Sequence, residues 1–343
     1  MEVRIKLFAR NGTKLTEPEQ IGEYSSHASS SISCDRLNLR HLKEFDKKAK
    51  TNFNLDVGFE TWIPKEPEDY CNDLREIQQW ALAANGDTSS TAKEALGGAD
   101  LVCVRGALTT IAVTPYNVDA GWRMVAVRVR GVIYLHDCAT RDGTRFAKAS
   151  GRLAHLMYWG FKFEQYLTTD AENNGDTSSP IDCRETFHAV FKTNLVRRGR
   201  ETQLRLVYTA EMDAVDQSNR YVELKTMGEK MGDKFWQYKA HKWWMQATLS
   251  GIDRIVIGHR NPSSGVVTKL ANMGTAQLSS NRKTDVMMTF LSTVLSEVEE
   301  RLPEGEDYGS VQIRYDPEEE RVYFEQAREQ DTNLWIDEFR KLI

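Results

Sequence analysis

Residues 206–226 read LVYTAEMDAVDQSNRYVELKT, and this stretch decides how the chain folds. Runs of β-branched, aromatic and aliphatic residues predict strands over 203–215 and 220–227. Between them, DQSN at 216–219 consists of residues that favour tight turns. The sequence therefore predicts an antiparallel hairpin.

Acidic side chains occupy unusual positions in this predicted hairpin. Side chains alternate between the two faces of a strand, so Glu211 and Asp213 share one face, as do Glu223 and Lys225. Cross-strand neighbours in a hairpin lie about 5 Å apart. Three carboxylates that meet on one face repel one another unless a cation lies between them, and hard oxygen ligands of this kind suit Mg²⁺ or Mn²⁺.

Lys225 follows Glu223 at the spacing E-x-K. An ammonium group beside a metal ion can orient or deprotonate a water molecule, and this D…E-x-K pattern is the working core of many metal-dependent nucleases. The simpler interpretation is a solvent-facing pair of strands in which Glu223 and Lys225 form a surface ion pair of little energetic value. The pattern alone leaves both interpretations open.

A further carboxylate precedes the hairpin, in the segment WGFKFE at 159–164. Glu164 is a candidate fourth ligand, either directly or through a water molecule. Helical periodicity over 146–159, followed by Gly160, predicts a helix that ends before this carboxylate. The aromatic residues around Glu164 are typical of a protein core as well as of a base-stacking surface, and spacing does not distinguish the two.

The rest of the chain predicts an α+β fold, with mixed β-sheets, flanking helices and a nuclease-like core that carries the active site in a cleft. No composition shift marks a domain boundary, so we expect a single domain over 1–343. Helical spacing predicts helices over 69–84, 234–249 and 282–301. Short apolar or alternating runs predict further strands over 101–104, 111–113, 124–129, 132–135, 186–195, 252–258, 311–315 and 321–325.

The charge balance limits how this protein can act on a nucleic acid. The 343 residues include 45 Lys and Arg against 50 Asp and Glu, a formal net charge of −5. Proteins that coat nucleic acid without specificity usually carry the opposite sign. If the substrate is a phosphodiester, the attraction must come from a local basic patch or from a bound metal ion.

Other features favour an intracellular protein that does not bind a membrane. No apolar stretch approaches the ~20 residues of a membrane-spanning helix, and the first residues, MEVRIK, lack the apolar region of a secretory signal. The five cysteines are widely spaced, which predicts reduced, buried thiols rather than a disulfide framework or a zinc site. We expect the protein in the nucleus, the cytoplasm or both, and not outside the cell.

Several short motifs occur in a fixed order along the chain. VRGALT begins at 104, and GFKFE, EMD, ELK, KWWMQ and IVIGHRNP follow from 160, 211, 223, 242 and 255. Each motif alone is a weak signal. Together, in this order and at this spacing, they resemble the motif set of the DXO family of eukaryotic RNA 5′-end decapping exoribonucleases.

The resemblance implies a hydrolase with one or two Mg²⁺ or Mn²⁺ ions that acts on single-stranded RNA 5′ ends in mRNA quality control. Family members hydrolyse 5′-triphosphates, unmethylated or incompletely methylated caps and nicotinamide-type caps, and many degrade the exposed RNA in the 5′ to 3′ direction. The implied metal ligands are Glu164, Asp213, Glu223 and the carbonyl of Leu224, with Glu211 in support. The implied substrate contacts are Glu211, Lys225, Gln246, Arg105 and the backbone around Val104 and Gly106.

Three features depart from the family pattern, among them His188, and two other functions stay open. His188 stands where the family often has a small thiol near the substrate, which bears on substrate preference; otherwise it is a packing histidine. A D…E-x-K DNA endonuclease would use the same carboxylates. A non-catalytic activator of a larger 5′–3′ exonuclease, as some relatives are, would need such a partner protein rather than the carboxylates.

Overall fold

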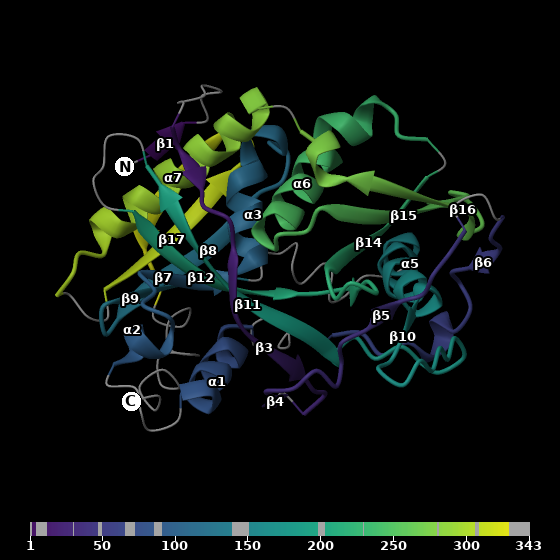
Figure 1. Ribbon diagram of the computed structural model, residues 1–343. Coiled ribbons are helices and arrows are strands. Elements are labelled where there is room, and N and C mark those ends of the chain that lie inside the picture. The colour runs from purple at the N-terminus through teal and green to yellow at the C-terminus, as the bar shows by residue number, and fades with distance from the viewer. Residues whose placement is uncertain are drawn as a thin grey trace.

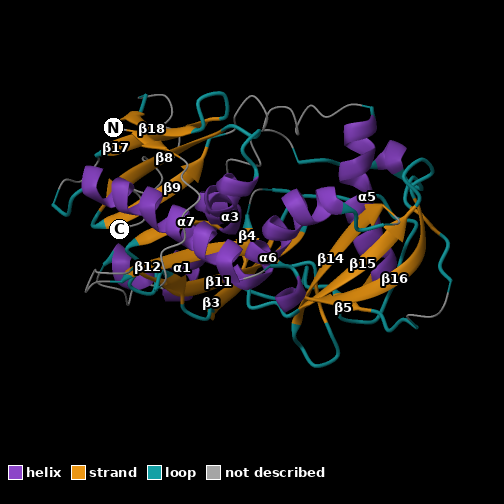
Figure 2. Cartoon of the chain, turned by 90° about the horizontal axis from the view of Figure 1, so that it is seen from above, coloured by secondary structure: helices purple, strands orange, loops and turns teal. Residues whose placement is uncertain are grey.

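Two β-sheets with helices on their faces make up the computed structural model of the protein (Figure 1). Figure 2 shows the larger sheet on one side and the smaller sheet on the other, with α3 and α6 near the middle. The structure describes residues 2–4, 12–29, 31–46, 50–65, 73–85, 91–138, 151–197, 203–228, 230–279, 281–305 and 309–328.

The larger sheet has eleven strands among the described residues. Its central strand β7 is parallel to both of its neighbours, β12 and β9, and is almost entirely buried, which explains its uninterrupted apolar sequence LVCV. The path runs through β1 (Glu2–Arg4), β18 (Arg321–Gln326), β17 (Ser310–Asp316), β8 (Trp122–Val129), β9 (Val132–Asp137), β7 (Leu101–Val104), β12 (Leu204–Glu211), β11 (Thr186–Val196), β3 (Glu19–Ser26) and β4 (Ile32–Ser33), while β2 (Lys14–Leu15) also pairs with β11.

The smaller sheet has seven strands among the described residues. Its longest ladder joins β14 in parallel to β15, which in turn pairs antiparallel with β16. The order is β10 (Thr168–Thr169), β5 (His41–Leu42), β13 (Ala214–Val215), β14 (Tyr221–Gly228), β15 (Arg254–Arg260), β16 (Val266–Gly274) and β6 (Phe53–Asn54).

Helices cover both sheets. One face of the larger sheet packs in a common core with α3, α6 and α7, and its other face packs with α1 and α2. Helix α5 packs on one face of the smaller sheet. The helices are α1 (Asp73–Asn85), α2 (Ala92–Ala95), α3 (Arg105–Val113), α5 (Arg152–Leu167), α6 (Ala240–Leu249) and α7 (Asn281–Arg301), with short helical turns η1 (Phe59–Thr61), η4 (Thr114–Tyr116), η6 (Thr275–Gln277) and the π-helix η5 (Phe235–Lys239).

Helix α6 belongs to both halves of the molecule. Its residues Met245, Ala247 and Leu249 are buried in the core of the larger sheet. Ala240 and Trp243 are buried with Ile255 and Ile257 of the smaller sheet. The helix therefore packs against both sheets and fixes their relative position.

The predicted central hairpin forms only in part. β13 and β14 pair antiparallel around the turn at 216–219, as expected. The strand predicted over 203–215 instead breaks at Met212 and Asp213, because β12 belongs to the larger sheet and β13 to the smaller one. Glu211 therefore lies in a different sheet from Glu223, and the prediction that both strands form one ladder is wrong for this residue.

Two further sequence predictions are also wrong. The run Ile111–Val113, predicted as a strand, is the buried end of α3. The helix predicted to stop before Gly160 continues to Leu167, because Trp159, Phe163 and Leu167 all pack on the smaller sheet and outweigh the roughly 1 kcal/mol that a glycine costs inside a helix. Residues 146–150 of that prediction lie outside the described residues.

The cysteines and the hydropathy agree largely with expectation. Cys103, Cys138 and Cys183 are buried free thiols, whereas Cys34 is exposed, contrary to the prediction. Cys71 lies outside the described residues. In the described part of the chain, no helix combines the length and the apolar character needed to cross a membrane.

Substitution of two glycines would test the packing of α5 on the smaller sheet. A Cβ atom added to Gly258 in β15 would lie 2.5 Å from Cε2 of Phe163, whereas one added to Gly160 would meet nothing within 4 Å. We expect Gly258→Ala to lower the free energy of unfolding by about 1–3 kcal/mol through overpacking. Gly160→Ala, the matched control, should raise it by up to about 1 kcal/mol. Urea unfolding monitored by circular dichroism measures both, and equal effects would contradict the packing described.

Candidate active site

The candidate site lies where the chain passes from the larger sheet to the smaller one. Glu211 ends β12, and Asp213 lies in the crossing itself. The Leu224 N–H donates a 2.7 Å hydrogen bond to Asp213 Oδ2, which ties the crossing to β14. Glu164 lies on α5, which packs against β14. The fold thus brings together acidic residues from three separate segments.

Strand alternation sets the direction of the two charged residues of β14. Val222 and Leu224 pack in the core under α5, whereas Met227 packs in the core formed with α6. Glu223 and Lys225 alternate with the first pair, so they share the face of Met227. That face also receives Arg105, the first residue of α3.

Glu223 is the most deeply buried carboxylate of the site, at 1% exposure. Lys225 Nζ donates to Glu223 Oε1, and Arg105 Nη1 donates to Oε2 at 3.4 Å and to Ser250 Oγ at 3.0 Å. Burial opposes ionisation of Glu223, but the charges of Lys225 and Arg105 outweigh it and lower the pKa of Glu223. The same contacts with Glu223 and Asp213 outweigh burial and raise the pKa of Lys225, which therefore stays protonated at neutral pH.

At Asp213 and Glu164, nearby basic groups do not outweigh burial. Burial, together with the charge of Glu223, raises the pKa of Asp213 to about 7. Burial and the charges of Asp213 and Glu211 raise the pKa of Glu164 well above its usual value. The site therefore contains more carboxyl groups than its own basic groups can keep ionised, as expected of a site that binds a cation.

The donor chemistry of this set fits a divalent metal ion. Glu164, Asp213 and Glu223 supply hard carboxylate oxygens of the kind that bind Mg²⁺ and Mn²⁺. Among the described residues, however, no three acidic, histidine or cysteine side chains already surround one point as ligands. Instead, Lys225 and Arg105 pair with Glu223. Loading of a metal would therefore redistribute these ion pairs.

Glu211 has a partner that the sequence did not suggest. Lys65, in the loop after η1, places its Nζ 3.7 Å from Glu211 Oε2. Burial opposes ionisation of Glu211, but Lys65 and other nearby basic groups outweigh it and lower the pKa of Glu211. Lys65 has no sequence motif around it and is far from Glu211 in the chain, so only the fold reveals it.

His188 belongs to a buried polar network beside the site. It pairs with Glu211 across the ladder between β11 and β12, stacks on Tyr24 at 5.0 Å, and lies 2.9 Å from Thr186 Oγ1. Its Nε2 is 4.0 Å from Oε2 of Glu76 on α1. Burial lowers the pKa of His188, so the ring is neutral at pH 7. These contacts satisfy His188 within the protein, and the same network brings in Glu76, which the sequence analysis missed.

The remaining sequence candidates lie around Arg105. Val104 ends β7 and is the N-cap of α3 without a side-chain cap, and Gly106 is the second residue of that helix. The N–H groups of the first turn are therefore available to an anion. Gln246 is half-buried on α6, one turn before Ser250, which binds Arg105. These candidates thus lie on the start of α3 and on α6, which the hydrogen bond between Arg105 and Ser250 joins.

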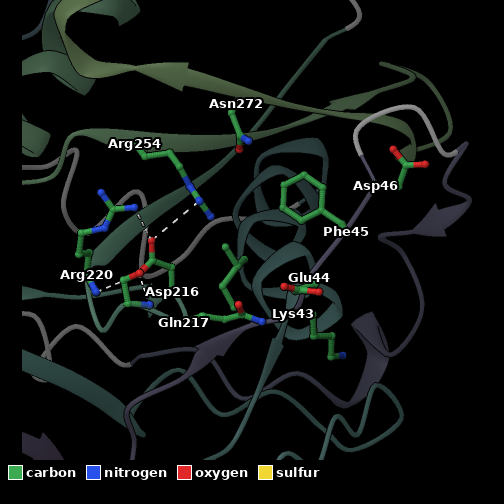
Figure 3. A pocket seen from close by; sticks show the side chains of 11 residues that line it. Lys43, Glu44, Phe45, Asp46, Asp216, Gln217, Arg220, Arg254 and Asn272 are labelled. Carbon is green, nitrogen blue, oxygen red and sulfur yellow. Dashed lines mark hydrogen bonds and ion pairs between the residues drawn. The ribbon is translucent and has the colours of Figure 1, made fainter.

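A cavity of about 800 Å³ lies elsewhere, at the turn between β13 and β14 (Figure 3). Asp216, on its wall, accepts hydrogen bonds from the backbone of Ser218 and Arg220 and pairs with the Arg220 side chain. Its carboxylate is therefore engaged in stabilising the turn. None of the residues that line this cavity belongs to the carboxylate site.

Comparison with protein families gives one match over almost the whole chain. Residues 16–340 match the family described as RAI1 like PD-(D/E)XK nuclease. The chain is 33% identical to the decapping nuclease dom-3 of Caenorhabditis elegans over 80% of its own length and 71% of that protein. It is 29% identical to the human decapping and exoribonuclease protein over 81% of its own length and 74% of that protein.

Solved structures share the fold at lower identity. The Rai1 of Scheffersomyces stipitis, in complex with (3′-NADP)⁺ and calcium, superposes with a TM-score of 0.80 at 16% identity and covers 99% of both chains. The Rai1 of Candida albicans, in complex with pU5 and Mn²⁺, gives 0.76 at 17% identity, over 98% of this chain and 95% of the other.

The raised pKa of Asp213 predicts a pH-dependent stability in metal-free buffer. Between its ordinary pKa of 3.8 and about 7, the folded state binds more protons than the unfolded state, so the free energy of unfolding falls as pH rises through this window. Asp213→Asn cannot ionise and should lose that fall. At pH 8 with EDTA we expect the variant to be more stable than the wild type by on the order of 1–2 kcal/mol. Thermal melts from pH 5 to 8 measure this, and parallel curves would contradict it.

Proposed function

The chain belongs to the family of RAI1-like PD-(D/E)XK nucleases, and on that premise we propose that it is a metal-dependent hydrolase of RNA 5′ ends. It removes incomplete or non-canonical caps, or 5′-triphosphates, and then degrades the exposed RNA in the 5′ to 3′ direction. The observation that supports the proposal is the mutual electrostatic influence of Glu164, Asp213 and Glu223 at one sheet junction, where Lys225 pairs with Glu223.

In this proposal the carboxylates bind metal ions, and Lys225 has a separate role. Glu164, Asp213 and Glu223, with the Leu224 carbonyl and support from Glu211, would hold the ions. A divalent ion in such a site lowers the pKa of water and neutralises charge on the phosphate under attack. Because its pKa is raised, Lys225 remains an ammonium group, so it serves as a hydrogen-bond donor that orients the water or a phosphate oxygen rather than as a base.

A phosphate next to the scissile bond would bind at the N-terminus of α3. The guanidinium of Arg105 is 10% exposed and already lies beside Glu223. The first N–H groups of α3, including that of Gly106, add the positive end of the helix dipole. Arg105 and this first turn would therefore bind a backbone phosphate, and Gln246 would complete the position from α6.

The choice among 5′ ends rests on the relatives. The Caenorhabditis protein is named a decapping nuclease, and the Rai1 structures were determined with a dinucleotide and with an oligouridylate. A single hydrolytic site can attack phosphorus in caps, triphosphates and phosphodiesters alike. We therefore propose an unmethylated guanosine cap, an NAD-type cap and a 5′-triphosphate as substrates, in the nucleus or cytoplasm. A 5′–3′ exonuclease partner is a further part of this proposal.

Loss of one ligand should abolish turnover without unfolding the protein. With Mg²⁺ or Mn²⁺ and RNAs that carry a triphosphate, unmethylated-cap, NAD-cap or monophosphate end, Asp213→Ala and Glu223→Gln should each lower kcat by at least about a thousandfold, because each removes a negative ligand. Chromatography of labelled products measures the rates. Glu318→Ala, on the exposed turn between β17 and β18, is the matched carboxylate control. Undiminished rates in both site variants would refute the metal assignment.

Circular RNA and circular single-stranded DNA separate an exonuclease from the competing endonuclease in the same assay. A 5′-end hydrolase leaves both circles intact because they present no end. If the wild type cuts the circles, the D…E-x-K endonuclease is the correct function. If purified protein turns over no substrate but accelerates a larger 5′–3′ exonuclease, the non-catalytic activator is correct.

The contribution of Lys225 to catalysis should be separable from its contribution to RNA binding. We expect Lys225→Ala to lower kcat by about a hundredfold or more while the affinity for RNA changes little, because the ammonium group acts mainly on the reacting water or phosphate. Single-turnover kinetics and fluorescence anisotropy measure the two quantities. Lys225→Arg keeps the charge and should recover part of kcat. A loss of affinity with kcat unchanged would make Lys225 a phosphate-binding residue only.

A further inference from the structure

An unusual helix leads into α6. Residues Phe235–Lys239 form a π-helix, a rare conformation that is frequent at functional sites. Trp236 and Tyr238 are 38% and 39% exposed, and both are among the most exposed large apolar residues that the structure describes. Because they are two residues apart on a helix, the two rings project from different sides of it, and each is open to a partner.

The π-helix that carries the two rings is anchored in the core through Phe235. Phe235 is 5% exposed and packs in the core between α6 and the smaller sheet. Its ring meets that of Trp236 edge-on at 5.1 Å and that of Trp243 at 5.0 Å. The π-helix is therefore anchored from below, so presenting Trp236 and Tyr238 costs little ordering entropy when a ligand binds.

The surroundings of the rings are basic. Between residues 230 and 249 the chain carries four lysines and a single acidic residue, Asp233. Lys234, Lys239 and Lys242 are exposed, and none of them forms an ion pair with a described residue. In a protein of net charge −5, this segment is a local exception. Its unpaired cations suit a polyanion.

Helix α6 connects this surface to the candidate active site. Ser250, just after α6, binds Arg105. Gln246 and Lys242 precede Ser250 by one and two turns, so Lys242 lies about 12 Å along the axis from it and Trp236 roughly 21 Å. Lys242 is open to solvent, but desolvation by neighbouring protein atoms, and then the charges of Lys225 and Arg105, lower its pKa, which agrees with this proximity.

We propose that Lys234, Trp236, Tyr238, Lys239 and Lys242, here called the π-helix platform, bind the single-stranded RNA that follows the 5′ end held in the active site. Trp236 and Tyr238 stack on bases, and the lysines bind phosphates. Stacking is tolerant of sequence because every base offers a π-face, which suits an enzyme that must accept any RNA. The inference rests on the proposed function and identifies the surface that binds the RNA beyond its 5′ end.

Binding as a function of RNA length tests the platform. We would measure the affinity for 5′-monophosphorylated oligoadenylates of 3 and 15 nucleotides by fluorescence anisotropy, in an Asp213→Asn background that prevents turnover. The 15-mer should bind more tightly than the 3-mer, because only the 15-mer reaches the platform. Adding Trp236→Ala and Tyr238→Ala should weaken the 15-mer about tenfold and leave the 3-mer unchanged.

Matched variants separate stacking, charge and folding. Trp236→Phe with Tyr238→Phe keeps two rings and should restore most of the affinity for the 15-mer. Lys239→Glu should weaken the 15-mer and reduce its salt dependence. Lys14→Glu on β2, which pairs with the end of β11 away from His188, changes the charge equally and should have no effect. Circular dichroism confirms that each variant folds.

Two results would overturn the platform. Equal affinity of the wild-type surface for both lengths would show that RNA does not run there, and undiminished 15-mer binding after the double alanine change would show that the rings are not used. In either case the exposed rings would be assigned to a protein partner instead. Because the readout is binding, it is independent of the hydrolysis assays: catalysis can fail while the length effect holds, or the reverse.

Discussion

The structure depends on an excess of buried negative charge at the point where the chain leaves one sheet for the other. Asp213 lies in that crossing, and Glu164 and Glu211 reach it from α5 and β12. Glu223 is compensated by Lys225 and Arg105, and Glu211 by Lys65, whereas burial prevails at Asp213 and Glu164. A purely structural junction would gain stability by burying apolar side chains instead. The proposed binding of a cation at this site accounts for the cost of keeping carboxylates there.

The second constraint is the position of α6. This helix packs against both sheets, so it fixes the distance between Glu211 on one side and Glu223 on the other. Its end meets Arg105 through Ser250, and its beginning continues from the exposed π-helix. One rigid element therefore couples the geometry of the carboxylates to the surface where a long substrate would lie.

Local chemistry was visible in the sequence, whereas long-range pairing was not. The turn at 216–219 and the spacing of Glu223 and Lys225 follow from alternation within a few residues, and the structure keeps them. The break after Glu211 could not be predicted, because nothing within β12 and β13 says that they join different sheets. Lys65 is likewise brought to Glu211 only by tertiary packing, and Gly160 lies inside a helix because of aromatic contacts with the smaller sheet.

The acidic residues of the candidate site come from both sheets, so the full set forms only when the two sheets pack together. β12 delivers Glu211, and β14 delivers Glu223, so neither half of the molecule contains a complete set of acidic groups. On the proposed assignment, a chain still emerging from the ribosome would lack the assembled set of acidic groups. Hydrolysis of RNA would then require the finished tertiary structure.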